Sequence, residues 1–143
     1  MDIAFVKLDP DVEAPRYAHP GDAGCDLTSR VDLTLQPGQR ALVPTGVAVS
    51  IPEGYAGFIQ PRSGLAVKHG ISIVNTPGLI DSHYRGEIKV VLVNLDRNNP
   101  FSIKRGDKIC QLVIQPVVRA EFREVEELDP TVRGEGGFGS TGT

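Results

Sequence analysis

The sequence predicts an all-β protein, a jelly-roll-like β-sandwich or barrel with one short helix and a flexible glycine-rich C-terminal arm. Three observations support this class. The apolar stretches are short and rich in β-branched residues, turn sequences such as "PGQ", "PEG" and "RNNP" separate them, and the chain holds 16 glycines and 11 prolines. Glycine and proline at this density favour turns and disfavour long helices.

Eight stretches have the length and composition of β-strands, and turn residues bound each of them. They cover residues 3–8, 31–36, 41–51, 55–60, 71–74, 87–95, 101–104 and 109–118. A ninth, "AEFREV" (120–125), alternates in polarity and could also pair as a strand. The one predicted helix is "SGLAVKHG" (63–70), with Ser63 as its cap and Gly70 at its end.

The length of 143 residues suits one domain, which we place over residues 1–130. The remaining segment, 131–143, is rich in glycine and carries one large apolar side chain, Phe138, so we expect a mobile arm. A sandwich with a long polar arm often gives that arm to a neighbouring subunit.

Composition excludes several classes of protein. The net charge of −3 provides no basic field for nucleic acid or an acidic membrane surface, and no basic strand is rich in aromatic residues. The longest apolar run, near "VVLV", is too short to span a bilayer, and the first ten residues lack the features of a signal peptide. We therefore expect a cytoplasmic protein with no nucleic-acid or membrane partner.

The cysteines and histidines predict no metal centre. Cys25 and Cys110 are the only cysteines, and in a chain without secretion signals we expect both to be buried or half-buried free thiols. None of the three histidines forms a metal-ligand spacing with either cysteine, so no zinc site is predicted.

The C-terminal stretch "GEGGFGST" (134–141) has the glycine spacing of a phosphate-binding loop. It lacks the lysine of a Walker loop and no helix can follow it, so a Walker ATPase is rejected. Glycines still let backbone N–H groups converge on an anion, Ser140 and Thr141 add hydroxyl donors, and Arg133 supplies positive charge. The alternative is a disordered tail.

A strand ends and a helix begins at "PRSGLA" (61–66), where Arg62 and Ser63 stand beside the helix N-terminus. This favours an anion, while the alternative is an ordinary cap with a solvated arginine. In "NTPGLIDSHYRGE" (75–87), Asp81 follows two apolar residues, so we expect a partly shielded carboxylate usable as a base. Tyr84 could pack on a sugar or a base, and the alternative is a hairpin with a solvated Asp81 and a core Tyr84.

Two further stretches are less specific. In "GDAGCDL" (21–27), turn positions are a better interpretation of Asp22 and Asp26 than a metal or water site. "RGDKICQL" (105–112) is interpreted as a hairpin turn followed by a strand, with Gln111 as a polar residue inside the strand.

Taken together, these stretches resemble the trimeric dUTP pyrophosphatase (dUTPase) family, which has five ordered motifs. The five counterparts cover almost the whole chain: "AGCDL" (23–27), "PRSGLA" (61–66), "NTPGLIDSHYRGE" (75–87), "RGDKICQL" (105–112) and "RGEGGFGSTG" (133–142). Each motif is modest alone, but five in this order are highly specific.

The resemblance implies a jelly-roll subunit, a homotrimer and three active sites between subunits. The implied reaction is attack of water on the α-phosphate of dUTP, which gives dUMP and diphosphate with Mg²⁺ as cofactor. Such an enzyme keeps uracil out of DNA and supplies dUMP for thymidylate synthesis.

The resemblance also implies roles for individual residues. Asp81 would orient and deprotonate the attacking water, and Asp26 would support the site and the water shell of a Mg²⁺ that has no direct protein ligand. The phosphates would be held by Arg62, Ser63, Gly64 and Gln111.

For the nucleoside, the uracil would be read by Asn75 and by the backbone of Leu79, Ile80 and Asp81, with Lys89 nearby. Tyr84 would pack against the deoxyribose and exclude a 2′-hydroxyl. From the arm, the γ-phosphate would be gripped by Arg133, Ser140 and Thr141, while Phe138 would stack on the uracil.

Two alternatives remain at this point. The related dCTP deaminases carry a catalytic glutamate in the strand after the substrate hairpin, whereas "IKVVLVN" has Val91 near that place and no carboxylate, which disfavours a deaminase. A non-catalytic β-sandwich would not need Asp81, Arg133 and the glycine-rich arm together.

Overall fold

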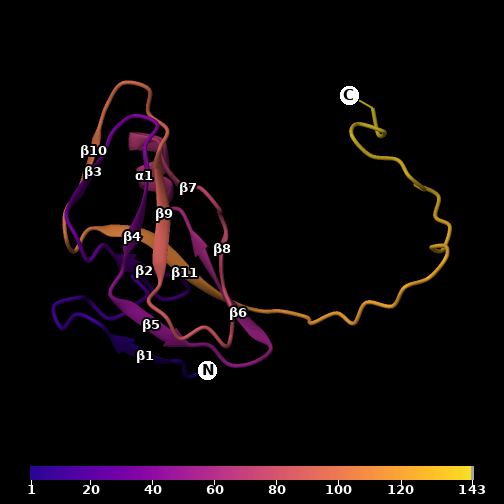
Figure 1. Ribbon diagram of the computed structural model, residues 1–143, viewed down its shortest axis with the longest axis horizontal. Helices are drawn as coiled ribbons and strands as arrows, with labels where there is room; N and C mark the ends of the chain where they lie inside the picture. Colours follow the sequence, from indigo (N-terminus) through magenta and orange to yellow (C-terminus); the bar gives the residue numbers. More distant parts are fainter. Residues whose placement is uncertain (143) are drawn as a thin grey trace.

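The computed structural model describes residues 1–142, so Thr143, the last residue of the predicted arm, lies outside the described residues. Within 1–142 the chain forms eleven strands and one helix (Figure 1). In chain order they are β1 (Ala4–Lys7), β2 (Gly24–Thr28), β3 (Leu33–Leu35), β4 (Arg40–Pro44), β5 (Val47–Ser50), β6 (Tyr55–Gln60), α1 (Ser63–His69), β7 (Ile71–Ile73), β8 (Gly78–Ile80), β9 (Lys89–Asn94), β10 (Phe101–Ile103) and β11 (Lys108–Pro116).

The strands form four antiparallel sheets. The two larger ones have the orders β2-β11-β6-β8 and β4-β9-β7, and the two smaller ones are the pairs β1-β5 and β10-β3. Neighbours in a sheet are often distant in sequence, as β2 and β11 are, so the topology depends on long-range pairing. The predicted all-β jelly-roll-type sandwich is confirmed, and the sheets formed by residues 1–142 do not close into a barrel.

One hydrophobic core lies between the two larger sheets. Leu27, Ile59 and Leu112 enter it from one sheet, and Val43 and Leu92 enter it from the other. All five side chains are at most 3% exposed. Successive residues of a strand point to opposite faces of its sheet, so residues between these core positions, such as Gln111 beside Leu112, face away from the core.

Two strands were not predicted. β2 carries a charged residue, Asp26, at its centre, and the sequence around it was interpreted as a turn; Asp26 is tolerated there because cations lie beside it. β8 is a three-residue strand inside a proline- and glycine-containing segment, and its pairing with β6 creates it. Both omissions have the same cause, since tertiary pairing overrode weak local signals.

Two other predictions need correction. The predicted single stretch over 41–51 is two strands, because Gly46 adopts φ 72° and turns the chain between β4 and β5. The predicted strand over 120–125 is not formed, and residues 117–142 hold no strand or helix. That segment has no strand beside it within the described chain to supply its hydrogen bonds.

Helix α1 differs from the prediction only at its start. Arg62 is the N-terminal flanking residue and no side chain caps the helix, so Ser63 is the first helical residue rather than the cap. The predicted end is confirmed, because Gly70 adopts the left-handed φ of 65° and donates its N–H to the carbonyl of Ala66. A Cβ at Gly70 would also lie 3.0 Å from the backbone nitrogen of Asp96, so glycine is required there.

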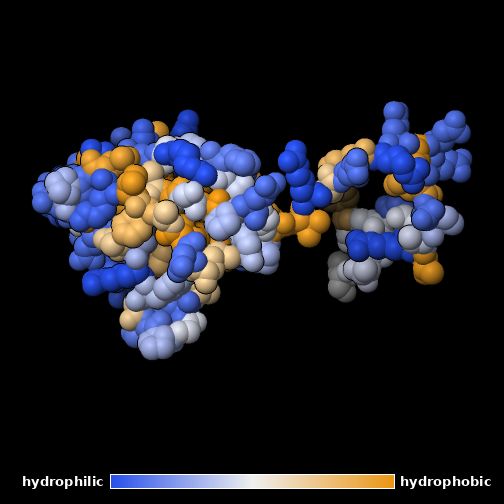
Figure 2. Space-filling view, turned by 90° about the horizontal axis from the view of Figure 1, so that it is seen from below, coloured by the Kyte–Doolittle hydropathy of each residue, from blue (hydrophilic) through white to orange (hydrophobic). Residues whose placement is uncertain are grey.

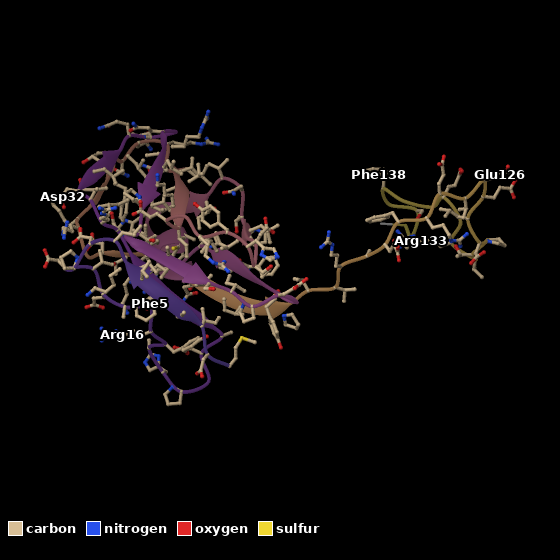
Figure 3. The ribbon with its side chains drawn as sticks, turned by 60° about the horizontal axis from the view of Figure 1, so that its bottom comes forward. Phe5, Arg16, Asp32, Glu126, Arg133 and Phe138 are labelled. Atoms are coloured by element: carbon tan, nitrogen blue, oxygen red, sulfur yellow. The ribbon has the colours of Figure 1, made fainter. Side chains whose placement is uncertain are left out.

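The arm leaves the body after β11. Val117 donates its N–H to the carbonyl of Gly54 at 2.9 Å, and the chain beyond then runs away from the sandwich (Figures 1 and 3). Figure 2 shows apolar residues gathered where the arm joins the body, and Val118 is 95% exposed. No helix within residues 1–142 combines the length and the apolarity that crossing a membrane requires.

Candidate active site

The first group of predicted site residues lies on the outer face of the β2-β11-β6 sheet. Register places Gln111 opposite Asp26 on one side and opposite Gln60 on the other. Three polar side chains therefore form a row across the sheet. Arg62 follows β6 by two residues, so the end of that strand delivers its guanidinium to the same place. We call Asp26, Arg62, Lys108 and Gln111 the Asp26 cluster.

Asp26 is the centre of this cluster. Its side chain is 8% exposed, Arg62 Nε lies 3.3 Å from Oδ1, and Lys108 Nζ lies 2.7 Å from Oδ2. Arg62 also donates from NH1 to the Lys108 carbonyl at 3.3 Å, which ties the two cations to one place. Oδ1 is buried and has no hydrogen-bond partner within residues 1–142, so it keeps a free acceptor position.

Lys108 was not selected from the sequence, although it stands in the "RGDKICQL" stretch. The sequence did contain a signal for Lys108. It begins the strand that holds Gln111 and precedes Gln111 by three residues, so its charge lies near Gln111 at the same end of the sheet. The partner that gives this charge a role lies on β2, which was not predicted as a strand. Ser63 and Gly64 are exposed at the start of α1 beside this cluster, where the first N–H groups of a helix lack intrahelical partners.

The second group surrounds β8 and the start of β9, where two pockets adjoin. The inner pocket is lined by Ile59, Ile73, Asn75, Gly78, Leu79, Ile80, Lys89 and Val90. The outer pocket is lined by Leu42, Leu79, Ile80, Asp81, Tyr84, Glu87 and Lys89. Leu79, Ile80 and Lys89 belong to both, so one flat group that entered the inner pocket would leave its attached substituent facing Asp81 and Tyr84.

The inner pocket combines apolar walls with a single side-chain amide, that of Asn75. A Cβ at Gly78 would lie 3.4 Å from the Cβ of Ile59 and 3.7 Å from Nδ2 of Asn75. The glycine therefore leaves space beside the Asn75 amide that a side chain would fill. An amide offers both a donor and an acceptor, which suits a planar ring that carries both kinds of group.

The structure corrects two expectations for the loop between β8 and β9. Asp81 is exposed in the single subunit rather than shielded by its apolar neighbours. Tyr84 is 44% exposed, so the alternative of a core tyrosine is wrong. Its hydroxyl donates to the Glu87 carbonyl at 2.9 Å, and its N–H donates to the Asp81 carbonyl at 3.1 Å.

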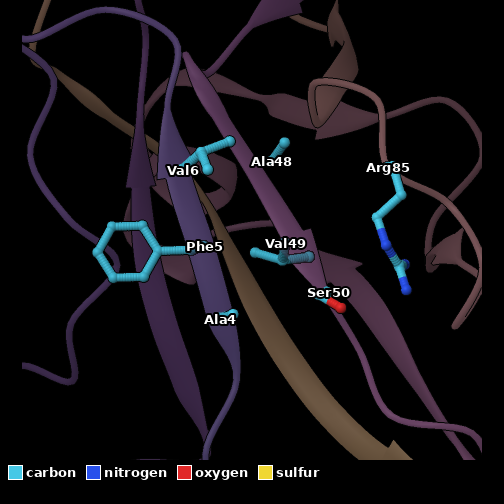
Figure 4. A pocket seen from close by; sticks show the side chains of 7 residues that line it. All are labelled: Ala4, Phe5, Val6, Ala48, Val49, Ser50 and Arg85. Atoms are coloured by element: carbon cyan, nitrogen blue, oxygen red, sulfur yellow. The ribbon is translucent and has the colours of Figure 1, made fainter.

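Arg85 braces this loop from within, and Glu87 holds it against the body. Arg85 donates to the carbonyls of Ser82 and Tyr84 at 2.6 and 2.9 Å, and its side chain lies across β5 from β1, beside Ser50 (Figure 4). Glu87 Oε1 accepts from the Gly46 N–H at 2.8 Å and from Arg30 at 3.0 Å. The Glu87 side chain therefore fastens the loop that carries Asp81 and Tyr84 to the turn between β4 and β5 and to Arg30.

The two groups lie at opposite ends of β6. Gly57 pairs with Ile80 and Ile59 pairs with Gly78, so the antiparallel β8 carries Asp81 toward the start of β6. Arg62 lies past the other end, five residues beyond Gly57. At ~3.3 Å per strand residue this separates Ile80, the residue before Asp81, from Arg62 by about 16 Å along the strand. One subunit does not bring Asp81 and the Asp26 cluster onto a single phosphate.

The third group is on the arm and touches neither of the others. Figure 3 shows Arg133 and Phe138 far from the sandwich, and Phe138 is fully exposed. Arg133 Nε donates to the Gly136 carbonyl at 2.8 Å, and a Cβ at Gly136 would lie 3.0 Å from Ser140 Oγ, so Arg133 and Ser140 turn toward the same short loop. Thr141 follows in the same run of turns.

The thiols behave as predicted. Cys25 and Cys110 are free and buried, and burial raises the pKa of both, to about 12 for Cys110. Within residues 1–142 no three histidine, cysteine or acidic side chains gather as a metal would require.

Comparison with known proteins shows one family throughout. A family model described as dUTPase matches residues 11–142. The deoxyuridine 5'-triphosphate nucleotidohydrolases of Thermobifida fusca and Cutibacterium acnes are 60% and 62% identical to this chain, over 95% and 90% of it and 76% and 84% of their own lengths.

Solved structures of dUTPases have the same fold as this chain. A Staphylococcus bacteriophage 80alpha dUTPase with dUPNHPP superposes with a TM-score of 0.92 at 32% identity, over 99% of both chains. A mutant dUTPase from phage phi11 of Staphylococcus aureus, described with a structural Mg(II) ion, gives 0.84 at 30% identity, over 91% of this chain and 100% of that one.

This chain has the architecture of a jelly-roll-type β-sandwich, the class of protein that its solved structural neighbours share. The family match and the relatives together place this chain within that class, and it belongs to the dUTPase family.

Proposed function

We propose that this chain hydrolyses dUTP to dUMP and diphosphate, with Asp81 as the base that activates water for attack on the α-phosphate. The reaction is that of the family to which the chain belongs. One observation supports the residue assignment most strongly: Asp81 and Tyr84 line a pocket that adjoins the inner pocket at Asn75. A nucleoside seated with its base at Asn75 would present its sugar to Tyr84 and its α-phosphate to Asp81.

In this arrangement Asp81 accepts a proton from the water as the oxygen attacks phosphorus, and diphosphate departs. No serine, cysteine or threonine nucleophile is needed, because the attacking oxygen comes from water. The exposure of Asp81 in the single subunit fits this role, since water must reach it and the substrate must then cover it.

The phosphates would be held by the Asp26 cluster together with Ser63 and Gly64. Arg62 is 33% exposed and Lys108 is 37% exposed, so each cation keeps a face for an anion while it contacts Asp26. A fork-shaped guanidinium is suited to two phosphate oxygens at once. Gln111, which lies opposite Asp26 on the neighbouring strand β11, would add an amide donor.

Asn75 would pair with the polar edge of the uracil, and the backbone of Leu79 to Asp81 would complete the pairing. Lys89 lines both pockets and would bound the base on the β9 side. The tyrosine ring at 84 would pack on the deoxyribose where a ribose carries its 2′-hydroxyl.

Mg²⁺ is proposed as a cofactor carried by the substrate. The residues fit this form of binding, since Asp26 lies between the two cations proposed for the phosphates and its carboxylate would support a water bound to the ion. When bound, Mg²⁺ would neutralise phosphate charge and polarise the phosphoryl oxygens.

We further propose a homotrimer with active sites between subunits. Asp81 and the Asp26 cluster are separated along β6 within one subunit, so a second copy would bring its Asp26 cluster to the Asp81 loop of the first. The segment after β11 stretches away from its own body with exposed Phe122 and Val118, which a neighbouring copy would cover. Residues 1–130 would form the single domain and 131–143 the lid, with Arg133, Ser140 and Thr141 on the γ-phosphate and Phe138 on the uracil.

The two free thiols favour a reducing compartment, so we place this enzyme in the cytoplasm. Neither nucleic acid nor a membrane is proposed as a partner, since the net charge is −3.

The test is incubation with dUTP and Mg²⁺ followed by separate assays for diphosphate and for ammonia, with dCTP as a second substrate. Diphosphate from dUTP without ammonia from either nucleotide is expected. Ammonia from dCTP would indicate a deaminase, and no product would indicate a non-catalytic sandwich. Light scattering on the same sample should give three times the subunit mass, and a monomer would contradict the shared site.

A further inference from the structure

We propose that Gly86 is a positioning residue that sets the place of the Tyr84 ring and thereby the preference for deoxyribose over ribose. Glu87 completes this arrangement by supplying and anchoring the acceptor for the Tyr84 hydroxyl. The proposal rests on the proposed function of Tyr84 against the sugar, and it deepens that function.

Gly86 lies directly under the Tyr84 ring. A Cβ built at residue 86 would overlap the phenol oxygen and lie 2.6 Å from Cζ and 2.9 Å from Cε2. Carbon atoms do not approach so closely, so any residue other than glycine would force the ring to move. The requirement is for space and not for conformation, because Gly86 is not among the glycines with positive φ.

The ring is held over Gly86 by one directional bond. The Tyr84 hydroxyl donates to the Glu87 carbonyl at 2.9 Å, only three residues along the chain. The bond closes a small loop over residues 84–87 in which the glycine lies beneath the ring. If the Glu87 carbonyl were mobile, this bond would not fix the ring relative to the pocket.

The Glu87 carbonyl is fixed because both the side chain and the next residue are fastened to the sandwich. Glu87 Oε1 accepts from Gly46 N–H at 2.8 Å and from Arg30 NH1 at 3.0 Å, and the side chain is 12% exposed. Ile88 follows with its N–H on the Val47 carbonyl at 2.8 Å. The turn between β4 and β5 thus holds the peptide that receives the Tyr84 hydroxyl.

If residue 86 gains a Cβ, the Tyr84 ring should move and the backbone around residue 86 should keep its position. The ring is 44% exposed and can rotate into solvent, whereas the peptide at Glu87 is anchored. A displaced ring would leave open the space beside the sugar. The expected defect is therefore in sugar discrimination, with little change in stability, since Gly→Ala at a compatible backbone position tends to stabilise a protein.

The experiment compares kcat/KM for dUTP with kcat/KM for UTP in the full-length enzyme and in the variants Tyr84→Ala, Tyr84→Phe, Gly86→Ala and the double variant Tyr84→Ala/Gly86→Ala. Ser82→Ala is the matched control in the same loop, since the Ser82 hydroxyl makes no hydrogen bond within residues 1–142 and only its carbonyl receives Arg85. Thermal unfolding of each variant runs in parallel.

Tyr84→Ala should lower the dUTP/UTP preference by roughly 10- to 200-fold, the range for one small steric contrast in a pocket. Gly86→Ala should lower it in the same direction with no loss of Tm, and Tyr84→Phe should lower it less because the ring remains. In the Tyr84→Ala background Gly86→Ala should add nothing, because the ring through which it acts is gone. Ser82→Ala should leave the preference unchanged.

The outcomes separate the two proposals. An unchanged preference in Tyr84→Ala would overturn the proposed role of Tyr84 and this inference with it. A lowered preference in Tyr84→Ala together with an unchanged preference in Gly86→Ala would overturn this inference alone. Equal effects of Gly86→Ala with and without the Tyr84 ring, or a large fall in Tm, would show that Gly86 acts on the loop itself and would also overturn it.

Discussion

The Lys108 ammonium group lies 2.7 Å from the carboxylate of Asp26, while the Arg62 guanidinium approaches the other oxygen of that carboxylate at 3.3 Å. The carboxylate is almost fully buried on β2, and these two cations are its charged partners. Each cation is in turn about one third exposed and so can serve an anion as well. Asp26 therefore holds in one place the two side chains that are proposed to bind phosphate.

Lys108→Met should destabilise the protein and weaken phosphate binding together. Removal of one partner from a buried charged group costs roughly 1–3 kcal/mol, and the remaining Arg62 keeps the loss at that level. Urea unfolding measures the first effect, and the KM for dUTP measures the second. Lys104→Met is the control, because its side chain makes no ion pair in the described chain. Wild-type stability in Lys108→Met would show that Arg62 alone satisfies Asp26.

Asp81→Asn should keep the fold and substrate binding and remove most of the turnover. The amide has nearly the shape of the carboxylate but cannot accept the proton of the attacking water. Loss of a positioned base lowers kcat by about 10²–10⁴-fold. Single-turnover measurement of diphosphate release, with a separate titration of a non-hydrolysable dUTP analogue, distinguishes chemistry from binding. Asp22→Asn serves as a control in a turn, and near-native turnover in Asp81→Asn would remove Asp81 from the mechanism.

The sequence alone was sufficient for the class of fold and for the local structure around several candidate site residues. Turn chemistry and β-branched runs predict most strands, and the five motifs place Asp81, Arg62 and Gln111 correctly on their elements. These signals are local, which is why they survive without any knowledge of the rest of the chain.

What the sequence did not reveal depends on pairing between distant segments. β2 looked like a turn because the cations that neutralise Asp26 come from residues 62 and 108. The register of β6 with β8 sends Asp81 away from Arg62, and no local pattern contains that register. The packing of Tyr84 on Gly86 was hidden for a different reason, since the role of that glycine lies in its missing Cβ.

The two cysteines should resist alkylation in the folded enzyme. Burial raises the pKa of Cys110 to about 12 and also raises that of Cys25, so both remain thiols at neutral pH, and the thiolate is the reactive form. Mass spectrometry after iodoacetamide at pH 7.5 should show no adduct on native protein and two adducts after unfolding in urea. Because the thiolate form grows only as the pH approaches the raised pKa, native labelling should begin only at strongly alkaline pH. Rapid labelling of the native protein at pH 7.5 would contradict the burial of these side chains.

Removal of residues 133–143 should leave a folded enzyme with much weaker catalysis. The hydrogen bonds of the described part of this segment are local, such as Arg133 to Gly136 and Ser140 to Gly137, and none reaches the sandwich. Phe138 is fully exposed, so its loss removes no buried apolar surface from the subunit. Thermal unfolding without substrate should therefore be unchanged. The number of subunits in the particle, measured from its mass in solution, should stay that of the intact enzyme.

The substrate complex should behave differently, because the arm then has a ligand to cover. Arg133 would meet the γ-phosphate and Phe138 would stack on the uracil, so kcat/KM for dUTP should fall steeply in the truncated enzyme. Phe138→Ala alone should be milder, since stacking of a base on an aromatic ring contributes roughly 1–3 kcal/mol by alanine substitution. Leu128→Ala is the control, because that apolar side chain is also exposed but lies before the glycine-rich segment. A large fall in Tm without substrate would make the arm part of the fold, and unchanged kinetics after truncation would show that it does not close over the site.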